Sequence, residues 1–278
     1  WPSLERAPAQ PSTRVSHDID YPFAYRHGPR RREWRTLRRQ VRARGLLPAM
    51  ADFARAKAGT DTADPYQTFT RLLDRASSPH TFYVFGGATH RLLDAGYTLD
   101  DPRILALLRR LHYDGHEIAL HPSYETFLSP ADVRREFRSL VHACERLGFP
   151  APRGSRQHYL RVRTPDTLRA LDAAGVGYDA SLGFADSAGF RCGTSKEFPL
   201  FDLEAAVPMA LLERPLIAMD CTVMDATYMG LGTGADAADL LGTLADRCHR
   251  YGGTFELLWH NSRMWRPEER ALYESVAT

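Results

Sequence analysis

The first residues in this sequence whose types and spacing could do chemistry are two aspartates, Asp18 and Asp20, in the stretch "RVSHDID" (residues 14–20). If that stretch is a β-strand, both side chains point to the same face, because alternate residues of a strand share a face. Two carboxylates that close repel each other unless a cation lies between them or one is protonated. The pair therefore predicts a divalent metal, with one carboxylate as a ligand and the other as a base.

His121 is the second candidate ligand, because it ends the apolar run "GHEIALH". Zinc accepts carboxylate oxygen and imidazole nitrogen, so Asp20 and His121 are predicted to share an ion. Zinc is expected first, with cobalt, nickel or manganese as alternatives. The third ligand could be either Glu125 or His158. Glu125 is four residues after His121, so one helical turn would bring both to the same side. The other interpretation of Glu125 is an ordinary surface acid.

Strands and helices must position these residues, and the two alternate along most of the chain. This alternation favours a parallel sheet, either open or closed into a barrel, and the C-terminal strand ends of a parallel barrel meet at one rim that hosts active sites. Seven strands are predicted, at residues 14–20, 80–86, 116–121, 154–160, 176–182, 214–220 and 254–260. Their ends carry Asp18, Asp20, His121, Arg156, His158, Asp179, Asp220 and His260.

Three further segments have a distinct character. Residues 1–13 are rich in Pro and Ser and are expected to form an irregular N-terminal lead-in before a single domain over residues 14–278. The Arg-rich residues 30–44 are expected to be helical, with either a solvated basic face or a surface that meets phosphates. Residues 183–208 are expected to form a long irregular loop, in which Arg191 and several phenylalanines could cover a substrate.

Composition limits the classes of protein. The chain has 278 residues, 44% hydrophobic, and a net charge of +2, so it can bury one large core and shows no overall bias toward nucleic acid. The four cysteines form no CxxC pair and indicate free thiols in a reducing compartment. Without an apolar run of 18 residues or an apolar leader segment, we expect no membrane span and a cytoplasmic location. The dominance of Arg over Lys is typical of a GC-rich bacterium.

Several motifs in order resemble those of the polysaccharide deacetylase (NodB-homology) family, in its bacterial branch with "HPSY". They are "SHDID", "GHEIALHPSYET", "RGSRQHYLR", "YDASLGFADSAGFRCGT" and "LLWHN", and they cover the chain from about Val15 to Ser262. The resemblance implies a distorted (β/α)7 TIM-like barrel of the α/β class. It also implies a metal-dependent carbohydrate N-deacetylase, an amide hydrolase acting on C–N bonds other than peptide bonds.

The resemblance also implies roles for individual residues. Asp18 matches the catalytic base and His260 the catalytic acid, while Asp20 and His121 match metal ligands. Arg156 matches the arginine that pairs with the base. Asp179 matches an acid that orients the histidine, with Asp220 as the rival. Leu258 matches the apolar residue of the pocket for the acetyl methyl group, and the further substrate-binding candidates are Tyr124, His158, Trp259 and Arg191.

Two departures from the family pattern stand out. Glu125 occupies the position of the usual second metal histidine, and Arg156-Gln157-His158 replaces an Arg-x-Pro motif. The expected substrate is an amino sugar or a sugar-containing small biosynthetic intermediate carrying an N-acetyl or similar acyl group, and a homodimer is left open. The alternative is a catalytically inactive barrel that has lost its metal and binds a glycan or small molecule.

Overall fold

Strand β1 (Ser12–Asp18) lies inside a sheet of nine strands, paired in parallel with β2 (Thr81–Val84) on one side and β9 (Thr254–Leu258) on the other. The structure is a computed structural model that describes residues 10–23, 30–58, 72, 76, 78–94, 96–264 and 266–277. The remaining strands are β3 (Glu117–Leu120), β4 (Gly154–Ser155), β5 (Tyr178–Asp179), β6 (Phe198–Asp202), β7 (Val207–Glu213) and β8 (Ala218–Met219). Their order is β6-β7-β5-β4-β3-β2-β1-β9-β8.

All neighbouring strands are parallel except β6 and β7, which form an antiparallel pair at one end of the order. Every residue of β2 and most of β9 are buried, which explains why these strands are almost continuously apolar, as in sheets covered on both faces. Among the described residues no ladder joins β7 to β8. The α/β sheet is therefore a distorted barrel rather than a closed one, as predicted.

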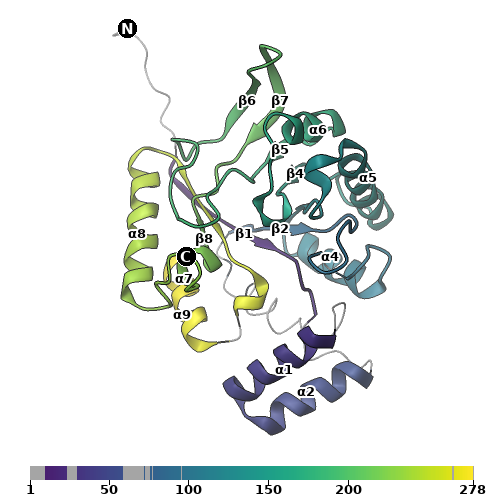
Figure 1. Cartoon of the computed structure of the whole chain (residues 1–278), viewed down its shortest axis with the longest axis vertical. Coiled ribbons are helices and arrows are strands. Elements are labelled where there is room, and N and C mark those ends of the chain that lie inside the picture. Colours follow the sequence, from purple (N-terminus) through teal and green to yellow (C-terminus); the bar gives the residue numbers. More distant parts are fainter. Residues whose placement is uncertain are drawn as a thin grey trace.

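Helices cover the outside of the sheet (Figure 1). Their boundaries follow capping chemistry: the Ser129 side chain accepts a bond from Asp132 N–H at the start of α5, and Gly148 ends it with φ of 75°. The other helices are α1 (Arg30–Arg44), α2 (Leu46–Ala58), α4 (Pro102–Tyr113), α6 (Asp166–Ala174), α7 (Asp220–Met224), α8 (Ala235–Arg250) and α9 (Pro267–Val276), with α5 spanning Pro130–Leu147. None of those in the described ranges is both long and apolar enough to cross a membrane.

Helices α1 and α2 form an antiparallel pair at one end of the molecule, beyond the barrel (Figure 1). They pack on each other through a small apolar cluster of Leu37, Ala49 and Ala56. A hydrogen bond from Arg39 on α1 to the buried Glu269 on α9 connects the pair to the barrel. The pair is thus a small attachment of the barrel with its own minor core.

All seven predicted strands are present, although β4 and β5 have only two residues each. The prediction of an irregular segment over residues 183–208 was wrong at its C-terminal end, where β6 and β7 form a hairpin. The missed signal is a burial alternation with period two, visible at Met209, Leu211 and Glu213. Strand β1 starts at Ser12, inside the predicted lead-in, and residues 1–9 lie outside the described residues. The sequence "YQTFTRLLDRA" (residues 66–76) also predicts a helix, and nearly all of it lies outside the described residues.

Three buried histidines line up beside β1 and β2. His17 Nδ1 donates to the Trp259 carbonyl oxygen (2.6 Å), so its Nε2 accepts from His80 Nδ1 at 3.0 Å. The backbone N–H of His80 donates to His116 Nδ1 at 3.0 Å. Burial is the main cause that lowers the pKa of all three, and it lowers the pKa of His80 to about 4. The network is therefore built from neutral imidazoles, each with a defined tautomer.

We expect the free energy of unfolding to fall as the pH drops from about 6.5 to about 4. His80 binds its proton more weakly in the folded chain than in the unfolded chain, so its contribution is complete above the unfolded pKa and is lost on acidification, at a cost of up to about 3 kcal/mol. Urea unfolding at several pH values measures this slope. His80→Gln should flatten it, whereas the matched control His142→Gln, at an exposed histidine, should not. Equal slopes in all three proteins would contradict the prediction.

Candidate metal and active site

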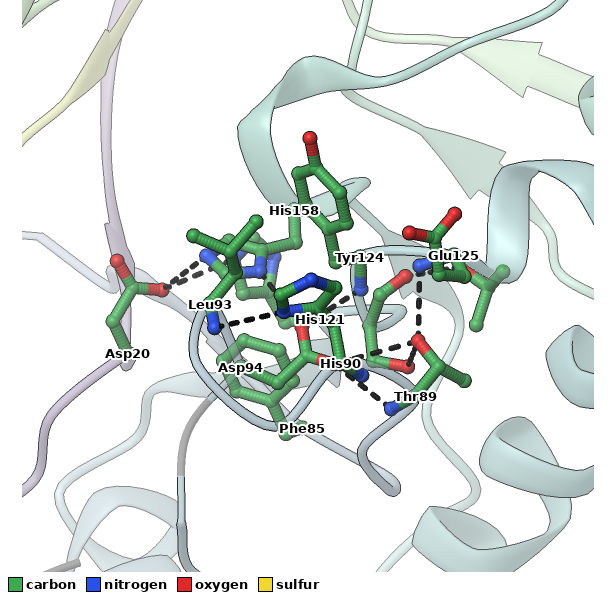
Figure 2. Close-up of polar contacts among 12 residues, drawn as sticks. Asp20, Phe85, Thr89, His90, Leu93, Asp94, His121, Tyr124, Glu125 and His158 are labelled. Atoms are coloured by element: carbon green, nitrogen blue, oxygen red, sulfur yellow. Dashed lines mark hydrogen bonds and ion pairs between the residues drawn. The ribbon is translucent and has the colours of Figure 1, made fainter. Parts of the chain in front are cut away.

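Three side chains meet where β1, β3 and β4 end. His121 Nε2 lies 3.3 Å from Asp20 Oδ1, and His158 Nε2 lies 3.6 Å from the same oxygen. One donor atom from each residue falls within 4.8 Å of the other two. Figure 2 shows Asp20 facing both histidines. The sequence predicted Asp20 with His121 and left His158 as one of two third partners.

The hydrogen bonds of the two histidines fix which nitrogen carries a lone pair. His121 Nδ1 lies 2.5 Å from the carbonyl oxygen of Arg156, which can only accept, so Nδ1 is the donor and the neutral ring has its lone pair on Nε2. His158 Nδ1 lies 3.1 Å from Asp94 Oδ1 and donates to it. When both rings are neutral, their Nε2 lone pairs face the Asp20 carboxylate. Burial lowers the pKa of His121, but Asp18 and Asp20 more than offset it and raise the pKa, so without a cation His121 favours holding a proton toward these carboxylates.

This arrangement fits a cation. Asp20 Oδ1 and His121 Nε2 are buried and have no hydrogen-bond partner among the described residues. Burial alone would raise the pKa of Asp20, but His158, His121 and His260 lower it below its ordinary value, so the carboxylate is charged. A carboxylate and two imidazoles are a donor set that zinc and similar divalent ions accept, and each histidine already has the hydrogen bond on its other nitrogen that metal-bound histidines have.

Asp94, which the sequence did not single out, organises the loops around this group. Its carboxylate accepts from the backbone N–H of Thr89 (2.8 Å), His90 (2.6 Å) and Tyr124 (2.7 Å), as well as from His158. Burial raises the pKa of Asp94, but these hydrogen bonds outweigh it and hold the pKa below its ordinary value. One carboxylate thus connects the loop after β2, the "HPSY" loop and the segment that carries His158 (Figure 2).

The structure does not bring Glu125 to this group. Its side chain is 42% exposed, lies 3.7 Å from Arg161, and points away from Asp20 in Figure 2. The expectation depended on a helical turn directly after His121. The chain is irregular there, and the 3-10 turn that follows (Thr126–Leu128) begins only after Glu125. His121 and Glu125 therefore do not share a face.

Arg156 crosses the barrel interior and holds Asp18. Its Nη1 lies 3.2 Å from Asp18 Oδ1 and 2.8 Å from Ser16 Oγ, while Nη2 lies 3.3 Å from Glu256 Oε1. The guanidinium also stacks over Tyr83 at 4.2 Å and is fully buried. The second oxygen of Asp18 lies 3.7 Å from His121 Nε2. Asp18 is thus fixed beside the metal candidate with one oxygen directed toward it.

His260 is held by Asp220 rather than by Asp179. Strand pairing explains this, because Met219 lies opposite Leu258 and places Asp220 next to the segment that follows β9. Asp220 accepts from both His260 N–H (2.8 Å) and Nδ1 (2.7 Å). Burial lowers the pKa of His260, but Asp220 more than offsets it and raises the pKa to about 10. Asp179 instead accepts from Ser155 Oγ (2.7 Å) and from Ser181.

A pocket of about 160 Å³ opens over these groups and is lined by Asp18, Asp20, His158, Tyr159, Leu160, Ala185, Met219, Cys221, Tyr228 and His260. Tyr159 and Leu160 have positive φ values of 58° and 53°, a region that bulky residues rarely adopt. Tyr159 is 58% exposed and Tyr228 is 45% exposed. Backbone strain of this kind is common at ligand sites, and here the two strained residues, Tyr159 and Leu160, both line the same pocket.

The other four predicted substrate-binding residues do not line this pocket. Trp259 is fully buried and packs on Tyr273 at 5.3 Å between centroids, so its ring is not accessible to a sugar. Leu258 is also fully buried, in a cluster with Leu160 that backs the pocket. The Tyr124 ring is covered by the Arg161 guanidinium at 3.7 Å. Arg191 donates to the Gly183 carbonyl oxygen at 2.8 Å.

A second group of possible metal donors, Asp220, Cys221 and His260, has a different character. Its aspartate and histidine already bind each other, and burial raises the pKa of the Cys221 thiol far above its ordinary value. A protonated thiol is a poor metal donor, because metals bind the thiolate. Within the described residues, Asp20, His121 and His158 are therefore the better metal site.

Comparison with known proteins agrees with this fold. The chain matches a solved structure from Mycobacterium smegmatis, described on a provisional assignment as a polysaccharide deacetylase, with a TM-score of 0.60 and 21% identity over 98% of this chain and 84% of that one. It also matches a family 4 carbohydrate esterase from Streptomyces lividans in complex with acetate, with a TM-score of 0.43 and 15% identity over 77% and 81% of the two chains.

No protein-family model and no curated protein matches the sequence. At 21% identity, the Mycobacterium smegmatis structure bears on the fold alone, and it confirms the fold that the motif resemblance predicted.

In the metal-free protein, we expect Asp220→Asn to lower the pKa of His260 from about 10 toward its ordinary value near 6.5, because the neutral amide no longer stabilises the imidazolium. NMR titration of the histidine side chains measures the change. Asp179→Asn, which alters a buried carboxyl group that has no contact with His260, is the matched control. An unchanged His260 titration in Asp220→Asn would contradict the assignment.

Proposed function

We propose that this chain is a metal-dependent amide hydrolase that removes an N-acetyl or similar acyl group from an amino sugar or a sugar-containing small molecule. The observation that carries the proposal is the convergence of His121 Nε2 and His158 Nε2 on Asp20 Oδ1, beside an anchored carboxylate and a protonated histidine. A divalent cation would replace the proton that His121 otherwise holds there, with Asp20, His121 and His158 as its ligands.

Such a cation would supply Lewis-acid chemistry, lowering the pKa of a water molecule and polarising an acyl carbonyl group. The base and the acid come from the chain itself. Asp18 keeps one oxygen toward the pocket while Arg156 holds the other, so it accepts the proton of the attacking water. His260 is protonated, and its Nδ1 donates to Asp220, which leaves the Nε2 proton for the departing amine.

The pocket supports a small acyl group with a larger substituent outside. Its volume of about 160 Å³ is below the roughly 300–1,000 Å³ of sites that bury drug-sized ligands. Tyr159 and Tyr228 are exposed at its lining and offer flat faces to a sugar ring. We infer that the acyl group enters the pocket while the sugar rests against these rings.

The backbone N–H groups of Ser123 and Tyr124, which follow His121, are not free to stabilise an oxyanion. Ser123 N–H donates to the buried Glu136 at 2.9 Å, and Tyr124 N–H donates to Asp94 at 2.7 Å. Both are therefore occupied in holding the loop. Their role is to keep His121 and His158 in position rather than to stabilise developing charge.

We expect His158→Ala to lose most of its affinity for Zn²⁺, while Glu125→Gln retains it, because the structure brings only the histidine to Asp20. Calorimetric titration of chelator-treated protein with Zn²⁺ gives both affinities. Asp94→Ala, which removes the hydrogen bond that orients His158, should fall between them, with a loss of about 10–100-fold. The reverse ranking, with Glu125→Gln losing the metal, would refute the ligand set. No metal binding by the unaltered chain would favour the inactive barrel.

We expect Asp18→Asn to lower kcat for acetate release from an N-acetylated amino sugar by about 10²–10⁴-fold or more, because an amide cannot accept the proton of water. Metal content should remain close to that of the unaltered protein, since Asp18 is not placed as a ligand. Acetate release and elemental analysis of the same preparations separate the two effects. Full activity in Asp18→Asn would remove the base from the mechanism.

A further inference from the structure

Helix α1 carries a basic surface that takes no part in the proposed hydrolase site. Four arginines lie on one face of this helix at positions i, i+3, i+4 and i+7, namely Arg35, Arg38, Arg39 and Arg42. Together with Arg266, Pro267 and Glu268 at the start of α9, they line a surface groove with a volume of about 590 Å³. Five arginines against one glutamate make this groove strongly positive, although the whole chain has a net charge of only +2.

The described residues leave most of this positive charge without an ion-pair partner. Arg39 alone has an acidic partner, lying 3.4 Å from the buried Glu269, which also lies 3.6 Å from Arg263. Among the described residues, Arg35, Arg38, Arg42 and Arg266 have no ion-pair partner. Like charges at i,i+3 and i,i+4 destabilise a helix, so an anion in the groove would relieve repulsion that the fold leaves in place.

The groove also receives a helix N-terminus. Helix α9 has ten residues and begins at Pro267, and its N-cap residue Arg266 makes no side-chain capping bond. Glu268 and Glu269 in the first turn of α9 offset the positive end of the helix dipole, so the arginines supply the positive charge of the groove. Guanidinium groups bind phosphoryl oxygens through paired hydrogen bonds, which favours phosphate over a lone carboxylate.

The groove and the pocket are connected by a short stretch of chain. Arg266 follows His260 by six residues, so the two Cα atoms are at most about 20 Å apart even if the chain between them is fully extended. In Figure 1, α1 lies beyond the barrel end toward which β1 runs, with α9 beside it. A ligand in the groove would therefore sit near the site without occupying it.

We propose that the groove between α1 and the start of α9 is a binding site for a small soluble ligand that carries two or more adjacent phosphoryl groups. This proposal does not depend on the hydrolase activity. The spread of five cations over a wide groove matches a diphosphate better than a single phosphate, because each phosphoryl group can engage its own arginines.

The test is a calorimetric titration of the chelator-treated full chain with inorganic pyrophosphate, since removal of bound metal prevents pyrophosphate from binding at the hydrolase site. We expect saturable one-to-one binding that weakens as salt is raised. The double variant Arg38→Gln and Arg42→Gln should bind about tenfold more weakly or worse, because two charge-assisted contacts are lost. Pyrophosphate should also raise the melting temperature of the unaltered chain but not of this variant.

Arg134→Gln and Arg138→Gln together form the matched control. These two arginines are also exposed and four residues apart on a helix, α5, but do not line the groove. Their loss should leave pyrophosphate binding unchanged. Equal weakening in both double variants would reduce the effect to general charge and overturn the proposal. Absence of saturable binding would do the same, as would binding to anionic lipid vesicles without binding to pyrophosphate.

Discussion

The site depends on one electrostatic constraint, which is that two imidazole lone pairs and a carboxylate are held against each other in a buried place. His121 and His158 each donate their Nδ1 proton away from the centre, to the Arg156 carbonyl oxygen and to Asp94. These hydrogen bonds leave only acceptors facing Asp20. Three such groups are costly to bury unless a proton or a cation lies between them, and the hydrogen bonds on Nδ1 keep both imidazoles turned toward Asp20.

The loops that impose this constraint are themselves tightly held. Asp94 accepts five hydrogen bonds, four from two loops and one from His158, and Glu136 accepts two from Ser123. Burial raises the pKa of Glu136 to about 7, although the bonds from Ser123 oppose this. Gly86 is required at this contact, because a Cβ atom there would lie 2.2 Å from the Glu136 carbonyl oxygen. Packing of α5 against the loop after β2 therefore determines the position of the "HPSY" turn.

Much of this could be predicted from the sequence, and the failures have physical causes. The seven strands follow from apolar runs bounded by turn residues, and parallel strand ends brought Asp20 and His121 together. Whether Glu125 or His158 is the third ligand depended on whether a helix directly follows His121. The hydrogen bonds that hold this loop, which come from distant parts of the sequence, determine that it does not. Asp94 lies in an irregular loop without a local pattern, so only tertiary contacts reveal its role.

The assignment of the partner of His260 shows a different kind of limit. Asp179 and Asp220 both follow predicted strands, and nothing in the local sequence separates them. The order of strands does, because β8 lies next to β9 whereas β5 lies on the far side of β1. Strand order is a long-range property that hydrophobic patterns do not encode. The β6–β7 hairpin was missed for the opposite reason, since its alternation is local but short.

The identity of the third proposed metal ligand, His158 rather than Glu125, changes how a bound ion would affect the stability of the barrel. Two ligands on one helical turn would tether only a pair of strands. With His158 in that position, a single ion would clasp segments that follow β1, β3 and β4, which are distant in the sequence. Because these ligands come together only in the folded chain, binding of the ion would add to the free energy of unfolding and reinforce the rim. Occupancy would then govern how firmly the mouth of the barrel is closed, in addition to the chemistry performed within it.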